Sequence, residues 1–165
     1  MDMFGYQAIG GNYMKNTVLM IAMLMICTAT RAQSIDTTQM IEQLNKMRAE
    51  GCKCGNIYMA AVPPLKWNET LEKAALEHSE YMAKIKVLKH QGADGSKAGD
   101  RITQNGYNWR TYGENVAMGP ETITAVVELW KNSPSHCKNI MNPAFTEIGA
   151  AKTGKYWTQV FATPR

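Results

Sequence analysis

The stretch from Trp130 to Gly149 reads WKNSPSHCKNIMNPAFTEIG, and the other predicted elements are arranged around it. It places His136 directly beside Cys137. Two proline dipeptides, Ser133-Pro134 and Asn142-Pro143, interrupt it. Since a residue that precedes proline disfavours helical backbone, we predict a shaped loop here rather than a regular element. A titratable ring beside a candidate covalent anchor makes this loop the place where other functional residues are expected to converge.

Regular elements are predicted on both sides of this stretch. Before it, apolar residues recur at the spacing of one helix face, in a helix that Pro120 opens. After it, residues 145–151 and 156–162 alternate like two strands, which a turn at residues 152–155 joins into a hairpin. The chain is therefore expected to end in an antiparallel pair of strands.

Upstream, helices are predicted over residues 37–50, 68–85 and 98–105, and strands over residues 58–62 and 112–119. Because helices come first and the hairpin last, we expect an α+β domain with an antiparallel sheet. Thr37 or Thr38 is the predicted cap of the first helix. Asn45 and Arg48 on that helix are either solvated or hold a neighbouring loop by hydrogen bonds. His78 lies on an apolar helix face and is predicted to bond a backbone carbonyl.

The first 32 residues are typical of a secretory signal peptide. Lys15 precedes the apolar run Thr17–Thr30, and small residues lead to Ala32, after which we expect cleavage. The run is short for a membrane span, which needs about 20 residues. Met14 is a more usual start, which would make residues 1–13 an extension. The alternatives are an uncleaved anchor or a lipoprotein.

Residues 33–165 are then expected to form a single secreted domain, extracellular or periplasmic, with no transmembrane segment after cleavage. This length suffices for a hydrophobic core, and we expect a monomer. The net charge of the chain is +4 at pH 7, and no basic run is interleaved with aromatic residues. We therefore expect no nucleic-acid partner.

Three cysteines follow the predicted leader: Cys52, Cys54 and Cys137. Export permits a disulfide. Cys52 and Cys54 flank Lys53 and are poorly placed to pair with each other, so we expect Cys137 to pair with Cys54 or Cys52. Closing a loop of roughly 85 residues stabilises by about 4–5 kcal/mol on the chain-entropy account. A thiolate metal site is the alternative, and it lacks the usual CxxC spacing.

His90, Glu114 and His136 are the candidate functional residues, because each lies in a loop or at the end of an element. Glu114 stands among glycine, valine, alanine and methionine, so its carboxylate is expected to be partly desolvated and to need a partner. Two histidines and a carboxylate suit either Zn²⁺ with an open position or an acid–base set. The chain contains neither an HExxH nor a GxSxG motif.

The order of several short motifs resembles the CAP superfamily, which groups cysteine-rich secretory proteins, antigen 5 and plant pathogenesis-related proteins. The motifs are Leu44–Arg48, Leu65–Asn68, His90, Gly113–Asn115, Trp130–His136, Asn139–Pro143, Phe145–Gly149 and Tyr156–Phe161. Small bacterial secreted members are the most similar, and the resemblance covers about residues 38–162.

The resemblance implies a three-layer α-β-α sandwich with a central antiparallel sheet. It also implies a cleft lined by His and Glu that can hold a divalent metal such as Zn. His90 and Glu114 match cleft positions, and His136 matches the bacterial SPxH segment. Tyr156 stands where many eukaryotic members have a histidine, and Glu128 is the nearest candidate for a further carboxylate. We therefore expect His136 to replace the missing ring, so that it shares one cleft with His90 and Glu114.

On this resemblance we expect a secreted binding domain rather than an enzyme. Its cleft would recognise a small molecule, a lipid, a divalent metal or an envelope component, and no other cofactor is expected. The alternative is a metal-assisted hydrolase that acts on peptides or cell-wall material. Ser133 and Ser135 lie near His136, but loop hydrogen bonding explains them better than a serine mechanism.

Overall fold

The computed structural model describes Met1 and residues 32–165. In this part of the chain the helices are α1 (Thr37–Glu50), α2 (Glu69–Ile85), α3 (Ala98–Gln104), α4 (Ile123–Asn132) and α5 (Pro134–Ile140). The strands are β1 (Ala32–Gln33), β2 (Cys52–Cys54), β3 (Ile57–Met59), β4 (Lys66–Trp67), β5 (Trp109–Met118), β6 (Glu147–Thr153) and β7 (Tyr156–Pro164).

The predicted signal peptide lies outside the described residues except at its first and last residues, and the alternative start at Met14 lies outside them too. Ala32, after which cleavage is predicted, pairs with Thr153 of β6, and Gln33 pairs with Lys152. Within residues 32–165, no helix has the length and apolarity that crossing a bilayer requires.

One sheet of five strands forms the centre of the molecule. Its order is β1-β6-β7-β5, and β4 pairs in parallel with the other end of the β6 edge. The β6–β7 hairpin and the β5–β7 pair are antiparallel, as predicted for the end of the chain. The residues of β7 are buried from Tyr156 to Thr163, which is expected of a strand covered on both faces. The strand β5 is left at an edge of the sheet.

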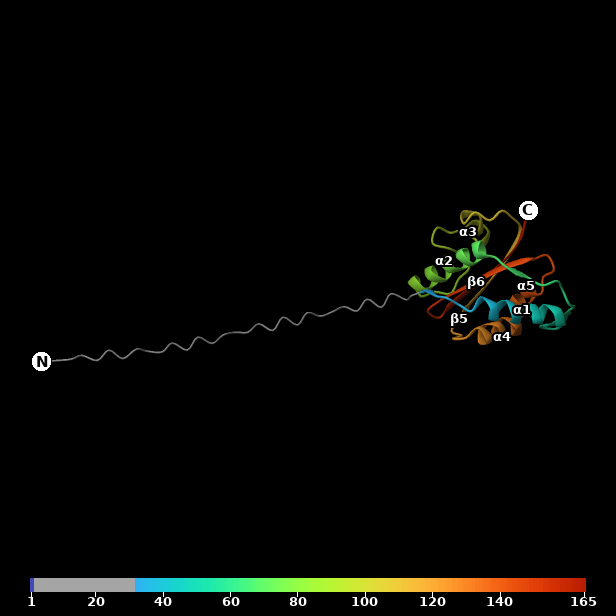
Figure 1. The fold of residues 1–165 in the computed structure, drawn as a ribbon, viewed down its shortest axis with the longest axis horizontal. Coiled ribbons are helices and arrows are strands. Elements are labelled where there is room, and N and C mark those ends of the chain that lie inside the picture. The colour runs from blue at the N-terminus through green and yellow to red at the C-terminus, as the bar shows by residue number, and fades with distance from the viewer. Residues whose placement is uncertain (2–31) are drawn as a thin grey trace.

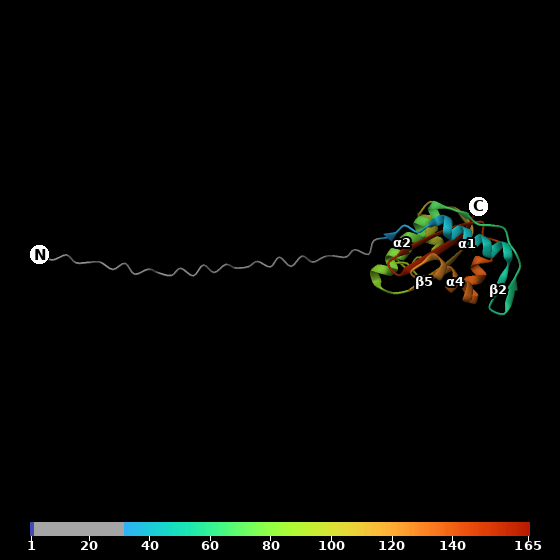
Figure 2. The same ribbon diagram turned by 60° about the horizontal axis from the view of Figure 1, so that its bottom comes forward.

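Alternate side chains of β7 enter two different helical layers. Trp157 and Phe161 pack with residues of α1, α4 and α5. Val160 and Ala162 pack with residues of α2 and α3. Figures 1 and 2 show these two groups of helices on opposite sides of the sheet. The predicted three-layer α-β-α sandwich with a central antiparallel sheet is therefore confirmed.

The first turn of α2 lies directly on the sheet, at a point where only glycine fits. A Cβ added at Gly149 of β6 would overlap the backbone of Leu71 and Glu72. This turn is capped by Asn68, whose side chain accepts from the N–H groups of Thr70 at 2.9 Å and Leu71 at 3.2 Å. The close contact sets the direction of α2 and therefore the position of the segment that follows it.

The prediction of a loop between Trp130 and Gly149 is wrong in the centre of this stretch, because residues 134–140 form the helix α5. Pro134 occupies the first helical position, where the missing N–H costs nothing and the fixed φ angle suits a helix. The proline that predicted a loop therefore begins a helix. This helix buries Cys137 and Ile140 against the core.

Three smaller predictions also differ from the structure. The cap of α1 is Asp36, which accepts from Gln39 N–H at 2.9 Å, rather than Thr37 or Thr38. The helix α4 begins at Ile123 after a Thr122 cap, rather than at Pro120. Instead of a strand over residues 58–62, the short strand β3 pairs with β2 in a separate hairpin.

Arg48 joins α1 to the segment between α5 and β6. Its guanidinium is fully buried and donates to four backbone carbonyls. The acceptors are Pro63 at 2.7 Å, Ile140 at 2.6 Å, Asn142 at 3.1 Å and Phe145 at 3.2 Å. Nearby, Asn45 exchanges two hydrogen bonds with the backbone of Leu65, at 2.8 and 2.9 Å. Of the two interpretations of Asn45 and Arg48, the one that has them hold neighbouring loops is confirmed.

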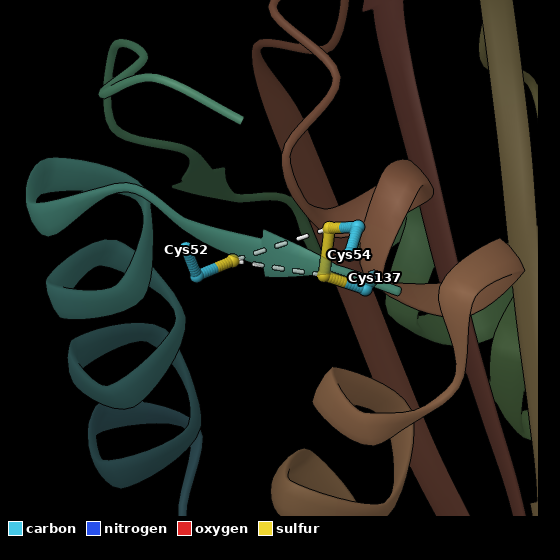
Figure 3. Close-up of side chains that lie close together, drawn as sticks. All are labelled: Cys52, Cys54 and Cys137. Carbon is cyan, nitrogen blue, oxygen red and sulfur yellow. Dashed lines mark hydrogen bonds between the residues drawn. A yellow bond between two sulfur atoms is a disulfide. The ribbon is translucent and has the colours of Figure 1, made fainter. Parts of the chain in front are cut away.

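A disulfide between Cys54 and Cys137 ties the β2–β3 hairpin to α5 (Figure 3). Of the two predicted partners of Cys137, Cys54 forms the disulfide and Cys52 is a free thiol. The bond links residues 83 positions apart in the chain. It therefore fixes a small hairpin, which lies outside the main sheet, onto the layer of α1, α4 and α5.

Candidate functional site

A cleft of about 400 Å³ opens where the segment between α2 and α3 meets the edge strand β5. It is lined by His90, Gln91, Gly95, Lys97, Ala98, Tyr112 and Glu114. Two of the three candidate residues, His90 and Glu114, are therefore brought together as predicted. They come from elements 24 residues apart in the chain.

His90 and Glu114 are hydrogen-bonded, with 2.8 Å between Nδ1 and Oε1. The His90 side chain is 61% exposed, whereas that of Glu114 is 5% exposed. Since a carboxylate only accepts, the proton of His90 lies on Nδ1 and Nε2 is left to face the cleft or solvent. His78 lies on the buried face of α2. Its Nε2 is hydrogen-bonded to the carbonyl of Lys89 at 2.8 Å, as predicted, and this bond holds the residue that precedes His90.

Glu114 has a second partner that the sequence did not predict. Arg101 of α3 donates through Nη2 to Glu114 Oε2. Its Nη1 donates to the carbonyls of His90 at 3.2 Å and Ser96 at 3.1 Å. The guanidinium thus holds the loop and the carboxylate together. One feature of the sequence could have indicated that Arg101 is buried: it shares one face of α3 with Ala98 and Ile102 at helical spacing.

The charge balance of the cleft is positive. The hydrogen bond that His90 donates to Glu114 raises the pKa of His90 above its ordinary value of 6.5, although partial burial of the ring opposes this. One carboxylate, Glu114, is therefore set against Arg101, the exposed Lys97 and His90, whose raised pKa favours the cationic ring. An approaching anion meets an excess of donors and cations.

His136 belongs to α5, whose backbone packs on the other side of the edge strand. Because strand residues alternate, Glu114 faces α3 while its neighbour Asn115 faces α5, where its Nδ2 donates to the His136 carbonyl at 3.2 Å. The His136 Nδ1 is buried without a hydrogen-bond partner. Burial first, and the nearby charge of His90 second, lower the pKa of His136. The ring is close to His90 but does not line the cleft.

A network of amides fixes α5 against the sheet beneath the site. Asn139 donates to the carbonyl of Glu114 at 3.1 Å and to Asn115 Oδ1 at 2.8 Å. Asn115 in turn donates to Gln159 Oε1 at 2.9 Å. These bonds join α5, β5 and β7, so the backbone that carries Glu114 is held from the face opposite its side chain.

Tyr156 and Glu128, the positions where the chain departs from the family pattern, lie away from this cleft. Tyr156 is buried against Met82, Ala83 and Val116. Glu128 is exposed on α4, where it accepts from Asn132 at 3.0 Å and lies 3.8 Å from Lys131. Neither supplies a further ligand to His90 and Glu114.

The cleft residues do not fit a divalent metal as they are arranged here. Both oxygens of Glu114 already accept, from His90 and Arg101, and the guanidinium would repel a cation. Among the residues that the structure describes, His136 joins His90 and Glu114 in no group whose ligand atoms all lie within 4.8 Å of one another. The carboxylate of Glu114 is instead the centre of an ion pair.

An α-β-α sandwich with a His–Glu pair beside the edge strand of its sheet is what the resemblance to the CAP superfamily implied. The sequence model of this family, described as the cysteine-rich secretory protein family, CAP, matches residues 41–161. The match covers well over half of the 165 residues, so the chain belongs to the cysteine-rich secretory protein family.

Relatives are found among bacterial proteins. The chain is 40% identical over 100 residues to the uncharacterized protein YkwD of Bacillus subtilis, and this stretch is 59% of the chain and 39% of that relative. An extracellular protein of Bacillus anthracis that contains an SCP domain has a similar fold, with a TM-score of 0.68 and 26% identity over 76% of this chain and 39% of that one. An outer surface protein of Borrelia burgdorferi matches with a TM-score of 0.63 and 24% identity, over 82% of this chain and 100% of that one. The chain thus spans less than half the length of the curated relative.

Proposed function

We propose that this chain is an exported binding domain whose cleft takes a small amphipathic anion, such as a fatty acid or a fragment of an envelope lipid. Export is supported by the predicted leader and by the family to which the chain belongs. The B. anthracis relative is described as extracellular. The single observation that carries the choice of ligand is that Arg101 neutralises Glu114, the one carboxylate that lines the cleft among the described residues.

The charged end of the ligand would lie between His90 and Lys97. Both side chains line the cleft and are exposed. His90 can present Nε2 to a carboxylate or phosphate while Nδ1 keeps its hydrogen bond to Glu114, and Lys97 can turn toward the same group. Glu114 does not repel the ligand strongly, because its charge is paired with Arg101. The hydrogen bond to Glu114 also raises the pKa of His90, although burial and the charge of Arg101 oppose this, and a raised pKa favours the cationic ring.

The apolar part of the ligand would lie on the wall formed by Tyr112 and Ala98. Tyr112 packs edge-on against Trp109 with 4.6 Å between ring centroids. Gly99 lets this ring approach α3, because a Cβ there would overlap the Tyr112 ring. The wall is therefore preformed, and binding would not require its side chains to become ordered.

Titration with octanoate, followed by calorimetry, tests this proposal. His90→Gln and Lys97→Gln should each weaken binding by about three- to fivefold, the usual range for a partly exposed charge contact. Binding to the unmodified chain should weaken as the pH rises above 6.5 and through the raised pKa of His90, since the ring loses its charge there. Lys155→Gln is the matched control, because Lys155 lies beside Tyr156 in a different cavity. Equal affinity in all four proteins, or no saturable binding, would overturn the proposal.

A hydrolase is the second candidate, and one observation favours it. The Nδ1 of His90 is bonded to Glu114, which leaves Nε2 to accept a proton from water as a general base. Peptide and cell-wall substrates tested with the unmodified chain and with His90→Gln distinguish the two functions. Hydrolysis that His90→Gln abolishes would favour catalysis, and its absence in both proteins would favour binding.

A further inference from the structure

Three sulfur atoms meet where the β2–β3 hairpin contacts α5 (Figure 3). The Cys52 thiol lies 3.6 Å from the Cys137 sulfur and 4.0 Å from the Cys54 sulfur. The latter two form the disulfide. A free thiol is thus in van der Waals contact with both atoms of a disulfide.

The sequence explains this contact. Cys52 and Cys54 are two residues apart in β2, so both side chains point to the same face of the strand. That face lies on α5, whose Cys137 is directed inward. The C-x-C spacing, which argued against pairing between the first two cysteines, therefore places both of them within reach of the third.

The three sulfurs differ in their access to solvent. Cys54 is 1% exposed and Cys137 is fully buried in the core. Cys52 is half-buried and lines a surface cavity of about 320 Å³ between α1 and α4. The Cys52 sulfur is itself buried, so a small thiol or disulfide in solution meets it from this cavity once the Cys52 side chain turns outward, whereas the disulfide lies in the core.

We propose that Cys52 is a thiol–disulfide exchange site that connects the buried Cys54–Cys137 disulfide to small thiols and disulfides in solution. In the first step the Cys52 thiolate attacks the Cys137 sulfur. The Cys52–Cys137 bond forms, the Cys54–Cys137 bond breaks, and Cys54 leaves as a thiolate that takes up a proton. No electrons are gained or lost.

An external thiol then completes reduction. Its thiolate attacks the Cys52 sulfur from the side of the cavity, which forms a mixed disulfide and releases Cys137 as a thiol. A second external thiol attacks this mixed disulfide, frees Cys52, and leaves as the external disulfide, so two electrons have passed to Cys54 and Cys137. The reverse sequence, from a small external disulfide, closes the buried bond through the same residue.

The reaction requires a rotation of Cys52 and a thiolate. The Cys52 sulfur is almost equidistant from the two others, whereas attack takes place along the S–S axis, so its side chain must turn. Burial raises the pKa of the Cys52 thiol, and Lys131 partly opposes this. Lys46 and Glu50 of α1 and Glu128 and Lys131 of α4 line the same cavity. Exchange should therefore accelerate as the pH rises through the alkaline range, since more of the thiol is ionised.

The rate of reduction by glutathione tests the proposal on the folded chain. Cys27→Ser is introduced into every protein, so that the remaining cysteines are Cys52, Cys54 and Cys137. At pH 8, the Cys54–Cys137 bond should be reduced roughly tenfold faster with Cys52 present than in Cys52→Ser. In a denaturant the difference should disappear, because the disulfide is then exposed in both proteins. Equal rates in the folded proteins would overturn the proposal.

A second measurement detects the intermediate. Acid quenching, alkylation and trypsin, which cleaves after Lys53, separate Cys52 from Cys54. Peptides joined through Cys52 and Cys137, with alkylated Cys54, should grow with time in the unmodified protein before glutathione is added. The Cys54→Ser variant should fold with a Cys52–Cys137 disulfide. If Cys54→Ser keeps two free thiols while it folds, Cys52 cannot reach Cys137 and the proposal is wrong.

Discussion

Two buried arginines, Arg48 and Arg101, lie on opposite faces of the sheet and differ in the acceptors of their hydrogen bonds. Arg48 is fully buried and donates to four backbone carbonyls. Arg101 is 6% exposed and donates to two carbonyls and to the carboxylate of Glu114. The first has only neutral acceptors, and the second has an opposite charge beside a cleft.

The two kinds of hydrogen-bond acceptor give the two buried guanidinium groups different roles. Carbonyl dipoles compensate the lost hydration of Arg48, but burial still lowers its pKa to about 10. It remains charged at neutral pH and fixes the segment between α5 and β6. Arg101 instead cancels a carboxylate and thereby sets the charge of the cleft. A guanidinium with neutral acceptors supports the scaffold, whereas one with a carboxylate tunes a site.

The largest effect is expected from Arg48→Met. The substitution leaves four carbonyls without their donor, and at about 1 kcal/mol each, the lower end for buried groups, the free energy of unfolding should fall by about 4 kcal/mol. Urea denaturation measures this. Arg110→Met is the control, since Arg110 is exposed, and it should change stability by less than about 0.5 kcal/mol. A similar small loss in Arg48→Met would mean that water replaces the guanidinium and that the contrast between the arginines is wrong.

Arg101→Met should come next, with a loss of about 3 kcal/mol, because it leaves the carboxylate of Glu114 buried and poorly compensated. Unlike Arg48, this arginine has a partner whose charge can be removed. The double variant Arg101→Met, Glu114→Gln should therefore be more stable than Arg101→Met alone. Chemical denaturation of both single variants and the double variant gives the coupling free energy. If Glu114→Gln adds to the loss instead of relieving it, the two charges do not act as a pair.

The sequence predicted the scaffold better than its details. The terminal hairpin and the helical periodicity are local signals, and the order of motifs predicted the three layers. The helix α5 was missed because Pro134 was interpreted as an interruption, although a proline is equally favourable at the first turn of a helix. The disulfide partner stayed open because C-x-C spacing directs both sulfurs to one face, and only the position of α5 distinguishes Cys54 from Cys52.

The site was predicted in two of its parts. His90 and Glu114 meet because the segment after α2 runs along the edge strand, as the resemblance implied. Arg101 was not predicted, because a cation on a short helix is usually solvated, and burial depends on how α3 packs on β5. His136 was expected in the same cleft, and the structure places it across the strand, since the alternation of Glu114 and Asn115 separates the two faces. Tertiary packing, which no local pattern contains, decides both cases.

The smallest expected effect is on the pH dependence of stability, and it differs between His90, which is bonded to Glu114, and His136, whose carbonyl is bonded to Asn115. The pKa of His90 is raised above 6.5, first by its hydrogen bond to Glu114, so its contribution to stability is complete below pH 6.5 and is lost as the pH rises through the folded pKa. The pKa of His136 is lowered by burial, so its contribution is present above pH 6.5 and is lost as the pH falls through the folded pKa.

Urea denaturation between pH 5 and pH 8 of His90→Gln, His136→Gln and the unmodified chain measures both contributions. On acidification the unmodified chain should gain stability relative to His90→Gln and lose stability relative to His136→Gln. The His90 effect should be smaller than either arginine effect, because the ring is 61% exposed and solvent screens its charge. Differences of the same sign for both histidines would show that His136 shares the anionic environment of Glu114, so that the strand does not separate the two sides of the site.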